Sequence, residues 1–537
     1  MPSASSADPG LMIAVDIGTT GVKVEAVDTA AVSHCGARRE YPTATPQPGW
    51  AEQDPESITE AARDAVREVA GRVLNTGRTV AGVAFSAAMH DLIGLDPDGK
   101  PLTPMVTWAD GRAAPQARQL RAADDWLGLH RRTGTPVHPM SPLVKLLWFR
   151  QERPDLWHRV AHWVGVKEYV LLRMAGLLTV DESIASATGL YNLASRDWDD
   201  GALTLAGIRR DQLPSLHATT DVVARLGADA AAWGLPAGTP VVVGASDGVL
   251  ANLGVGAVAP GVVACSIGTS GAIRGVVDQP RVDDRGRVFC YALVPGRWVV
   301  GGAINNGGNV LRWLGRVMGA DLADPDVGLT EVASSVPPGA EGLLMLPYLS
   351  GERAPRWSGD PHGALLGLTQ HHTRAHLARA ALEGVCLQLG LVLAAMRAAG
   401  LELRELRATG GFAHSPFWRQ LLADVLGTPI GFPAGEQGSA VGAALLGHVA
   451  LGNLGSVDEA ADLIRVVDVV RPDAAAADFY RGLLPAFAAT GEAVEGLQSW
   501  RAGAAASTAR DGPSRIPGKN LPAPLPDQDR SPRASQE

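Results

Sequence analysis

Residues 11–24 read LMIAVDIGTTGVKV, and residues 261–274 read GVVACSIGTSGAIR. Each stretch is an apolar run typical of a β-strand, then a turn of Gly, Thr and Ser, then a second β-type run with a cation near its start. Equivalent positions, such as Gly18 and Gly268, are 250 residues apart. A single copy would indicate an ordinary hairpin, because such turns are common between strands. Two copies, each opening one half of the chain, favour a duplicated domain.

Turns of this kind can bind phosphate. Their backbone N–H groups and hydroxyls surround a concavity that suits phosphate oxygens, and glycine allows a ligand to approach closely. Two such turns facing each other across a cleft, one around Gly18 and one from Gly268 to Ser270, would hold one polyphosphate from both sides. The sequence contains no GxxxxGK[ST] motif, which excludes a Walker-type loop.

Length and composition limit the class of protein. The chain has 537 residues, 46% of them hydrophobic, and a formal net charge of −9. So long a chain exceeds what one hydrophobic core supports, and the apolar content excludes a mostly disordered protein. The negative charge argues against a nucleic-acid binder that relies on a broad basic face.

Alternating strand and helix patterns predict layered α/β domains. We expect strands near residues 80–86, 240–245, 298–302, 342–346 and 406–410, and helices near 55–73, 141–150, 374–399 and 417–426, with a further helix opening after residue 436. We predict a first domain over residues 11–253, which carries the first turn and the substrate side, and a second over 254–498, which carries the nucleotide side. Residues 1–10 and 499–537 are predicted to be disordered tails, since the latter segment has almost no large apolar residues.

The sequence predicts a soluble, cytoplasmic protein. Its four cysteines are scattered, without a CxxC pair, as expected for reduced core residues. The apolar run over residues 11–15 is too short for a secretory signal, and charges interrupt the apolar helix that follows Thr373.

Two aspartates stand where catalysis would need them. Asp247 ends a buried-type strand and precedes a glycine, and in open α/β sheets ligands bind at the carboxyl ends of strands. A carboxylate there could take the proton from a substrate hydroxyl as it attacks a γ-phosphate. The ordinary alternative is a turn residue that caps the next helix. Asp16 leads into the first turn, so we assign a Mg²⁺ site to Asp16 and Asp247, with a strand-end hydrogen bond as the alternative for Asp16.

Two further glycine turns follow strands. Residues 406–415 read LRATGGFAHS, and residues 301–308 read GGAINNGG. Exposed backbone in the first could cover the face of an adenine, although a lone Gly-Gly pair is more often a structural turn.

The chain resembles the FGGY carbohydrate kinases from Ile13 to about Leu451. Residues 140–152, MSPLVKLLWFRQE, and residues 363–383, which begin GALLGL, fit two long signatures of that family throughout. The resemblance implies two domains of ribonuclease-H/actin-like topology with a cleft between them, MgATP in the cleft, and an aspartate base that matches Asp247. It assigns the nucleotide, with the flanking turn residues, to Gly18, Thr19, Thr20, Lys23, Gly268, Thr269, Ser270, Gly308, Arg312, Gly411 and Ser415.

Within the family the chain is most similar to the gluconokinases. The matching stretches include residues 86–90, 107–112, 132–140, 164–169 and 350–355. The expected reaction is therefore phosphorylation of a sugar acid by ATP, giving 6-phospho-D-gluconate from D-gluconate. The alternatives are a kinase for another sugar or polyol such as xylulose and, more distantly, an actin- or chaperone-like ATPase.

Gluconate ends in a carboxylate, so a selective site needs a cation. One charge-assisted hydrogen bond is worth about 1.5–3 kcal/mol, enough for roughly 10–150-fold discrimination. Lys145, Lys167 and Arg353 are the main candidates and His138 is a further one, with surface or ion-pair roles as the alternative for each. The other predicted substrate contacts are Met89, His90, Trp108, Asp110, Asn305 and Asp247. We expect ATP and a sugar acid as partners, neither nucleic acid nor membrane, and leave a homodimer open.

Overall fold

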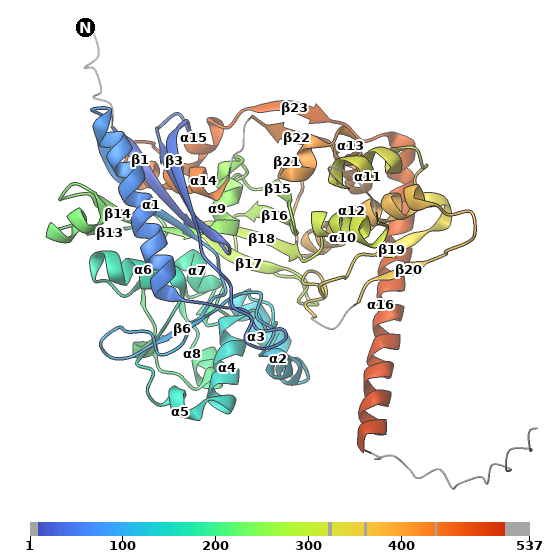
Figure 1. Ribbon diagram of the computed structural model, residues 1–537, viewed down its shortest axis with the longest axis horizontal. Coiled ribbons are helices and arrows are strands. Elements are labelled where there is room, and N and C mark those ends of the chain that lie inside the picture. The colour runs from blue at the N-terminus through green and yellow to red at the C-terminus, as the bar shows by residue number, and fades with distance from the viewer. Residues whose placement is uncertain (1–8, 320–324, 359–361, 435–437, 511–537) are drawn as a thin grey trace, which may run out of the picture.

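The computed structural model describes residues 9–319, 325–358, 362–434 and 438–510. It contains two large mixed sheets, one in each half of the chain, with helices on both faces (Figure 1). The predicted α/β class, with two actin-like halves, is confirmed by this architecture and by the sheet order given below.

The N-terminal sheet has the strand order β13-β14-β5-β1-β2-β3. Its strands are β1 (Leu11–Ile17), β2 (Gly21–Val27), β3 (Ser33–Glu40), β5 (Val80–Ala87), β13 (Val222–Arg225) and β14 (Pro240–Ser246). Alternate residues of β1 enter two different cores: Ile13 and Val15 pack with α1 (Pro55–Asn75), while Met12 and Ala14 face α14 (Ser439–Ala450). Because both faces of β1 are covered, its sequence is a continuous apolar run rather than an alternating one.

The C-terminal sheet has the order β17-β18-β16-β15-β21-β22-β23. Its strands are β15 (Val262–Ile267), β16 (Gly271–Val277), β17 (Phe289–Val294), β18 (Arg297–Ile304), β21 (Glu405–Thr409), β22 (Ile430–Pro433) and β23 (Val466–Val470). β15 pairs antiparallel with β16 and parallel with β21, just as β1 pairs antiparallel with β2 and parallel with β5. The repeat in the sequence is therefore a repeat in the fold.

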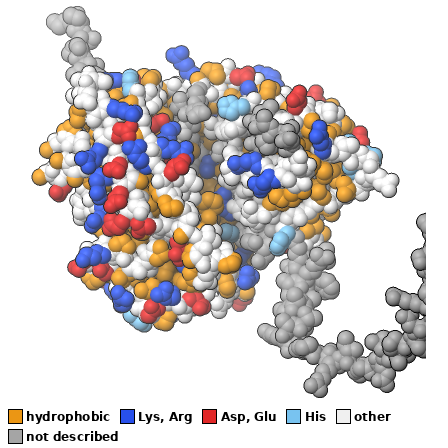
Figure 2. Space-filling view, in the orientation of Figure 1, with side chains coloured by type: hydrophobic (Ala, Val, Ile, Leu, Met, Phe, Trp, Pro, Cys, Tyr) orange, Lys and Arg blue, Asp and Glu red, His pale blue; other side chains and the backbone are white. Residues whose placement is uncertain are grey.

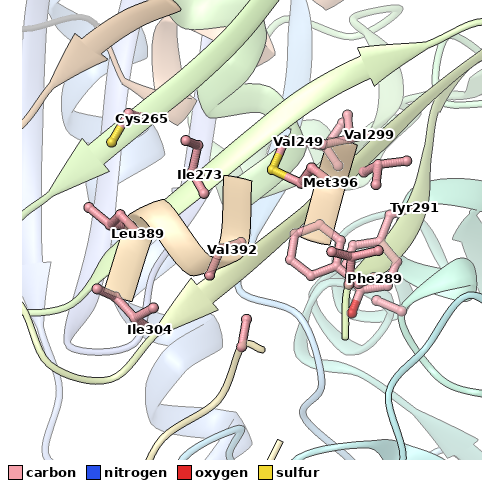
Figure 3. Packing of buried hydrophobic residues seen from close by; sticks show 14 of the residues in the cluster. Val249, Cys265, Ile273, Phe289, Tyr291, Val299, Ile304, Leu389, Val392 and Met396 are labelled. Atoms are coloured by element: carbon pink, nitrogen blue, oxygen red, sulfur yellow. The ribbon is translucent and has the colours of Figure 1, made fainter. Parts of the chain in front are cut away.

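Helix α12 (Arg374–Ala398) packs against β16 and β18 of the C-terminal sheet. Figure 3 shows Val392 and Met396 of this helix among strand residues such as Ile273. By length and composition α12 is the one helix of the described residues that could cross a membrane, but 83% of its apolar window is buried inside the protein. Its apolar character is thus accounted for by core packing.

The segment between β5 and β14 builds the lower part of the N-terminal half in Figure 1. Its main elements are β6 (Ile93–Leu95), α2 (Ala114–Arg121), α3 (Trp126–Thr133), α4 (Pro142–Glu152), α5 (Pro154–Trp157), β8 (His162–Val164), α6 (Val166–Ala175), β9 (Thr179–Asp181), α7 (Glu182–Ser186), α8 (Asp200–Ala206) and β12 (Ser215–His217). The C-terminal half adds α10 (Gly308–Val317), α11 (Pro325–Ser334), β19 (Leu344–Leu346), β20 (Ala364–Leu366), α13 (Pro416–Leu426) and α15 (Val457–Asp462).

One predicted boundary needs correction. Helix α16 (Ala474–Arg510) continues twelve residues into the segment predicted as a disordered tail from residue 499. The stretch is rich in alanine, which has the highest helix propensity, so a lack of large apolar residues did not exclude a helix. Residues 511–537 and 1–8, the rest of the two predicted tails, lie outside the described residues.

Candidate functional site

Two cavities adjoin the turns of the repeat. The first, of about 330 Å³, contains Asp247 and is called the Asp247 cavity; the second, of about 660 Å³, is called the Gly411 cavity. Both are lined by Gly268 and Thr269, so they meet at the turn between β15 and β16. Figure 2 shows the surface hollowed between the N- and C-terminal halves of the molecule.

Asp247 is the first residue of α9 (Asp247–Gly254), directly after the fully buried strand β14. Three residues earlier, Gly244 adopts a φ of +75°, and a Cβ there would lie 1.7 Å from the carbonyl oxygen of Phe85. The register between β14 and β5 shifts at this point. A bulge of this kind re-aims the residues that follow it, so Gly244 helps to turn Asp247 toward the cavity.

A second carboxylate lies near Asp247. Asp16 Oδ1 accepts from the Ser86 hydroxyl at 2.6 Å, and Asp16 Oδ2 accepts from the Ser439 hydroxyl at 2.7 Å. Desolvation raises the pKa of both aspartates, and the charge of Asp16 further raises the pKa of Asp247, to about 7. Two neighbouring carboxylates that repel each other are suited to a divalent cation.

The raised pKa of Asp247 predicts a pH dependence. A general base must be deprotonated, and an acid with a pKa of about 7 loses that form as the pH falls. We expect kcat/KM for the acceptor to be half-maximal near pH 7, to level off about one pH unit above it, and to approach a tenfold fall per pH unit about one unit below it. Steady-state rates from pH 5.5 to 9 check this, with nucleotide binding over the same range as the control. A flat profile down to pH 5.5 would contradict it.

The first turn brings one predicted residue to the Asp247 cavity. Thr19 lines it, held by Trp108 Nε1, which donates to Thr19 Oγ1 at 2.8 Å, and by Gln53 Nε2, which donates to the Thr19 carbonyl at 2.7 Å. Lys23 lies on β2, half-exposed, and pairs with Glu25 at 2.9 Å. Neither of the two cavities, as formed by the described residues, is lined by Lys23 or by the predicted Gly18 and Thr20.

The second turn brings most of the predicted nucleotide residues together. The Gly411 cavity is lined by Gly268, Thr269, Gly308, Arg312, Gly411 and Ser415. The amide of Gly308, at the start of α10, donates to the carbonyl of Gly268 at 2.8 Å, and Arg312 Nη2 donates to Thr269 Oγ1 at 2.8 Å. Ser270 faces the other way and lines the Asp247 cavity.

Part of the wall of the Gly411 cavity is aromatic, and the sequence analysis did not predict these aromatic residues. Phe412, Phe417 and Trp418 line it, from the start of α13 and the turn before it. Glycine backbone near the turn suits phosphate, and an apolar wall suits a base. The cavity therefore has the two parts that a nucleotide requires.

Four predicted acceptor residues do line the Asp247 cavity: Met89, His90, Trp108 and Arg353. The His90 ring is 2.8 Å through Nδ1 from the carbonyl oxygen of Ala187, which identifies Nδ1 as the donor and leaves Nε2 as an acceptor. Burial lowers the pKa of His90 to about 3, so the imidazole is neutral. Its Nε2 lies 3.5 Å from the Tyr291 hydroxyl, so it can accept a weak hydrogen bond from that group or one from a polyol hydroxyl.

Arg353 is held in place from one side. Its Nε donates to Asn305 Oδ1 at 2.7 Å, and Asn305 Nδ2 in turn donates to the Ser350 carbonyl at 2.9 Å. The guanidinium carbon lies 4.7 Å from the centre of the Trp108 ring. Asn305 thus positions Arg353 and does not itself line the cavity, contrary to the sequence prediction.

The two predicted lysines lie elsewhere, which corrects their assignment to the substrate. Lys145 is fully buried, and its ammonium donates to three backbone carbonyls, those of His90, Val106 and Thr107. Lys167 is also buried and forms an ion pair with Asp181. Both cations therefore bind groups of the protein itself and have a structural role.

Two other candidates are held outside the cavity. Asp110 accepts from the Arg112 side chain through both oxygens at 2.8 Å. His138 accepts from the Met140 amide at 3.2 Å, and its ring packs edge-on against Trp357, itself a cavity residue. Burial lowers the pKa of His138 to about 3, so it supplies no positive charge.

The sequence reasoning missed Arg274, Phe289 and Tyr291, which all line the Asp247 cavity. The signal for Arg274 was present. Counted from the turns, Arg274 corresponds to Val24, one residue beyond Lys23, and a one-residue change in a strand moves a side chain to the other face. Lys23 is consequently half-exposed, whereas Arg274 shares the cavity face of β16 with Ala272.

Comparison with known proteins agrees with this architecture. Residues 11–254 match the N-terminal domain, and residues 263–451 the C-terminal domain, of the FGGY family of carbohydrate kinases. A gluconokinase from Bacillus subtilis (strain 168) is 40% identical over 490 residues, which cover 89% of this chain and 94% of that protein. A xylulose kinase from Escherichia coli (strain K12) is 32% identical, covering 82% of this chain and 90% of that protein. The crystal structure of a gluconate kinase from Lactobacillus acidophilus superposes with a TM-score of 0.85 at 32% identity, covering 90% of this chain and 98% of that one.

Proposed function

We propose that this chain, which belongs to the FGGY family of carbohydrate kinases, transfers a phosphoryl group from ATP to the 6-hydroxyl of D-gluconate. Family membership makes the chain a phosphotransferase that acts on a sugar hydroxyl, with ATP as a substrate. The finer assignment rests on one observation. A guanidinium, Arg353, and a carboxylate, Asp247, line the same cavity, so an acceptor can be bound at an anionic end and deprotonated at an alcohol end.

The two cavities divide the reaction between them. ATP would lie in the Gly411 cavity, with its base against the aromatic wall and its phosphates toward Gly268 and Thr269, where the two cavities meet. Asp247 takes the proton of the acceptor hydroxyl as that oxygen bonds to the γ-phosphorus. The bond from phosphorus to the bridging oxygen breaks, and ADP leaves with 6-phosphogluconate as the product.

Mg²⁺ fits the same place. Asp16 and Asp247 are the residues that would hold it, and Mg²⁺ typically takes one or two carboxylates while keeping waters and substrate phosphates as its other ligands. No group of three or more acidic, histidine or cysteine ligands occurs in the described part of the chain, which is consistent with a cation that depends on the nucleotide. When bound, the ion would neutralise charge on the transferring phosphate.

A kinase for xylulose is the second candidate, favoured by the 32% identity to the Escherichia coli xylulose kinase. The actin- or chaperone-like ATPase is disfavoured, because both domains of the chain match a sugar-kinase family.

A panel of acceptors tests the proposal. In a coupled assay of ADP release, we expect kcat/KM for D-gluconate to exceed that for D-glucitol, D-xylulose and glycerol by about tenfold or more, the range of one charge-assisted hydrogen bond. D-Glucitol is the matched control, since it replaces the carboxylate of gluconate with an alcohol. A preference for xylulose would establish the second candidate, and ADP release that is independent of any acceptor would establish an ATPase.

A further inference from the structure

A second guanidinium faces the Asp247 cavity. Arg274 lies on β16, and Ala272, two residues before it on the same face of the strand, lines the cavity as well. Strand residues rise about 3.3 Å each, so Arg274 stands about 10 Å along the strand from Gly271, where the turn ends. An extended six-carbon acid is of comparable length. Its guanidinium lies beside Gly248, the residue that follows Asp247 in the chain.

Two glycines leave room for this side chain. A Cβ on Gly301, the neighbour of Arg274 on β18, would lie 3.2 Å from Cγ of Arg274. A Cβ on Gly248 would lie 3.3 Å from its Nε. A Cβ would meet other atoms as well, since it would lie 2.3 Å from the Ile273 carbonyl oxygen at Gly301 and 3.0 Å from Met89 Cε at Gly248. The arginine is thus closely packed where it passes both glycines.

The guanidinium of Arg274 has no acceptor within hydrogen-bond distance among the described residues, and it forms no ion pair there within 4 Å. Burial lowers its pKa, and the nearby Asp247, then Cys265 and Tyr291, act in the opposite direction. Taking a charge out of water without a partner is costly. Such a group is suited to an anion that arrives with the substrate.

The charge of the cavity points to the same conclusion. Among its described lining residues the charged side chains are Asp247, Arg274 and Arg353, so two cations face one carboxylate. Arg353 is already committed through Nε to Asn305 and through Nη2 to the carbonyl of Ile304 at 3.2 Å. Arg274 keeps its whole guanidinium available for a bidentate contact, the geometry that matches a carboxylate.

We propose that Arg274 is a specificity-determining residue, which binds the carboxylate of a sugar-acid acceptor together with Arg353. The inference rests on the proposed function and deepens it, because it names the residues through which the cavity would select an anionic acceptor. Arg274 acts on the substrate end that does not react, so its contribution is to binding of the ground state and the transition state alike.

The test compares Arg274→Met and Arg274→Lys with the wild-type chain. Met keeps the length and apolar stem of the side chain without its charge, and Lys keeps the charge without the fork. Arg38→Met, an exposed position on β3, is the matched control for loss of one positive charge. Each protein is assayed with D-gluconate and D-glucitol, and gluconate binding is measured by calorimetry without nucleotide. Circular dichroism and thermal unfolding establish that each variant is folded.

We expect Arg274→Met to raise KM and Kd for gluconate about 10- to 100-fold with kcat changed less than about threefold, and to leave the kinetics with glucitol near wild type. Arg274→Lys should recover part of the affinity. An unchanged KM overturns the inference, and so does an equal fall of kcat with both acceptors, which would place Arg274 at the transferring phosphate. Failure of the proposed function is visible in the wild-type chain alone, because that chain would then phosphorylate neutral sugars but not gluconate. In that case this inference fails as well. If the wild-type chain prefers gluconate and the variants do not change KM, only this inference fails.

Discussion

Replacement of Asp247 by Ala is expected to lower kcat about 10²- to 10⁴-fold, the range of general-base assistance, while ATP still binds. Asp247 lines the cavity that meets the phosphate turn at Gly268 and Thr269, but it does not line the Gly411 cavity. The Gly411 cavity therefore keeps its lining in the variant, and Asp16 remains as the other residue proposed to hold Mg²⁺. Single-turnover phosphorylation of gluconate measures the loss, and titration with a fluorescent ATP analogue measures nucleotide binding. A variant with near-normal kcat would remove Asp247 from the role of base.

A measurement of the stability of Asp247→Ala shows whether its loss of activity is due to unfolding. Burial and the charge of Asp16 raise the pKa of Asp247 in the folded protein above that of an unfolded aspartate. Above pH 7 the ionised group thus disfavours the folded state, and its removal should leave the denaturation midpoint unchanged or raise it. Asp247→Asn, which keeps the shape and loses the basicity, should show the same loss of rate. Asp98→Ala, in an exposed turn, is the control for removal of a carboxylate that has no part in the site.

The two-domain fold was predictable because the same strand–turn–strand pattern occurs in both halves of the sequence. The strands that flank each turn are read directly from apolar runs, and the paired helices follow from their periodicity. The parallel neighbours β5 and β21 complete both halves in the same way, although nothing in the sequence links them to their partners. The membership of Gly268, Gly308 and Gly411 in one cavity was predictable only through the family resemblance, since a glycine turn taken alone is uninformative.

The side chains of the acceptor site were less predictable, and the lysines show why. A sequence gives the charge of Lys145 but not its hydrogen-bond acceptors. These are backbone carbonyls at least 38 residues earlier in the chain. Whether a cation meets a substrate or the backbone depends on that tertiary geometry. The aromatic wall of the Gly411 cavity was missed for a similar reason: Phe417 and Trp418 read as ordinary residues of an amphipathic helix, and only the position of α13 exposes them to the cavity.

Lys145→Ala is expected to lower the free energy of unfolding by about 2–5 kcal/mol, the range found when a large buried side chain is truncated to Ala. The ammonium is the shared donor for three carbonyls, and it joins α4 to the loops that carry His90 and Trp108. Without it, three buried acceptors and a cavity remain. Chemical denaturation measures the change. An unaltered midpoint would contradict a structural role.

Catalysis provides the second readout for Lys145, and Lys145→Met is the matched variant, because Met fills the space without donating. Since the lysine fixes the loops behind Met89, His90 and Trp108 rather than touching the acceptor, the KM values for gluconate and glucitol should rise by the same factor. Arg274→Met changes the ratio of the two KM values; Lys145→Met should leave it constant. If Lys145→Met raised the KM for gluconate but not that for glucitol, Lys145 would bind the carboxylate of the substrate. The acceptor site would then have to extend past the His90 loop into the core.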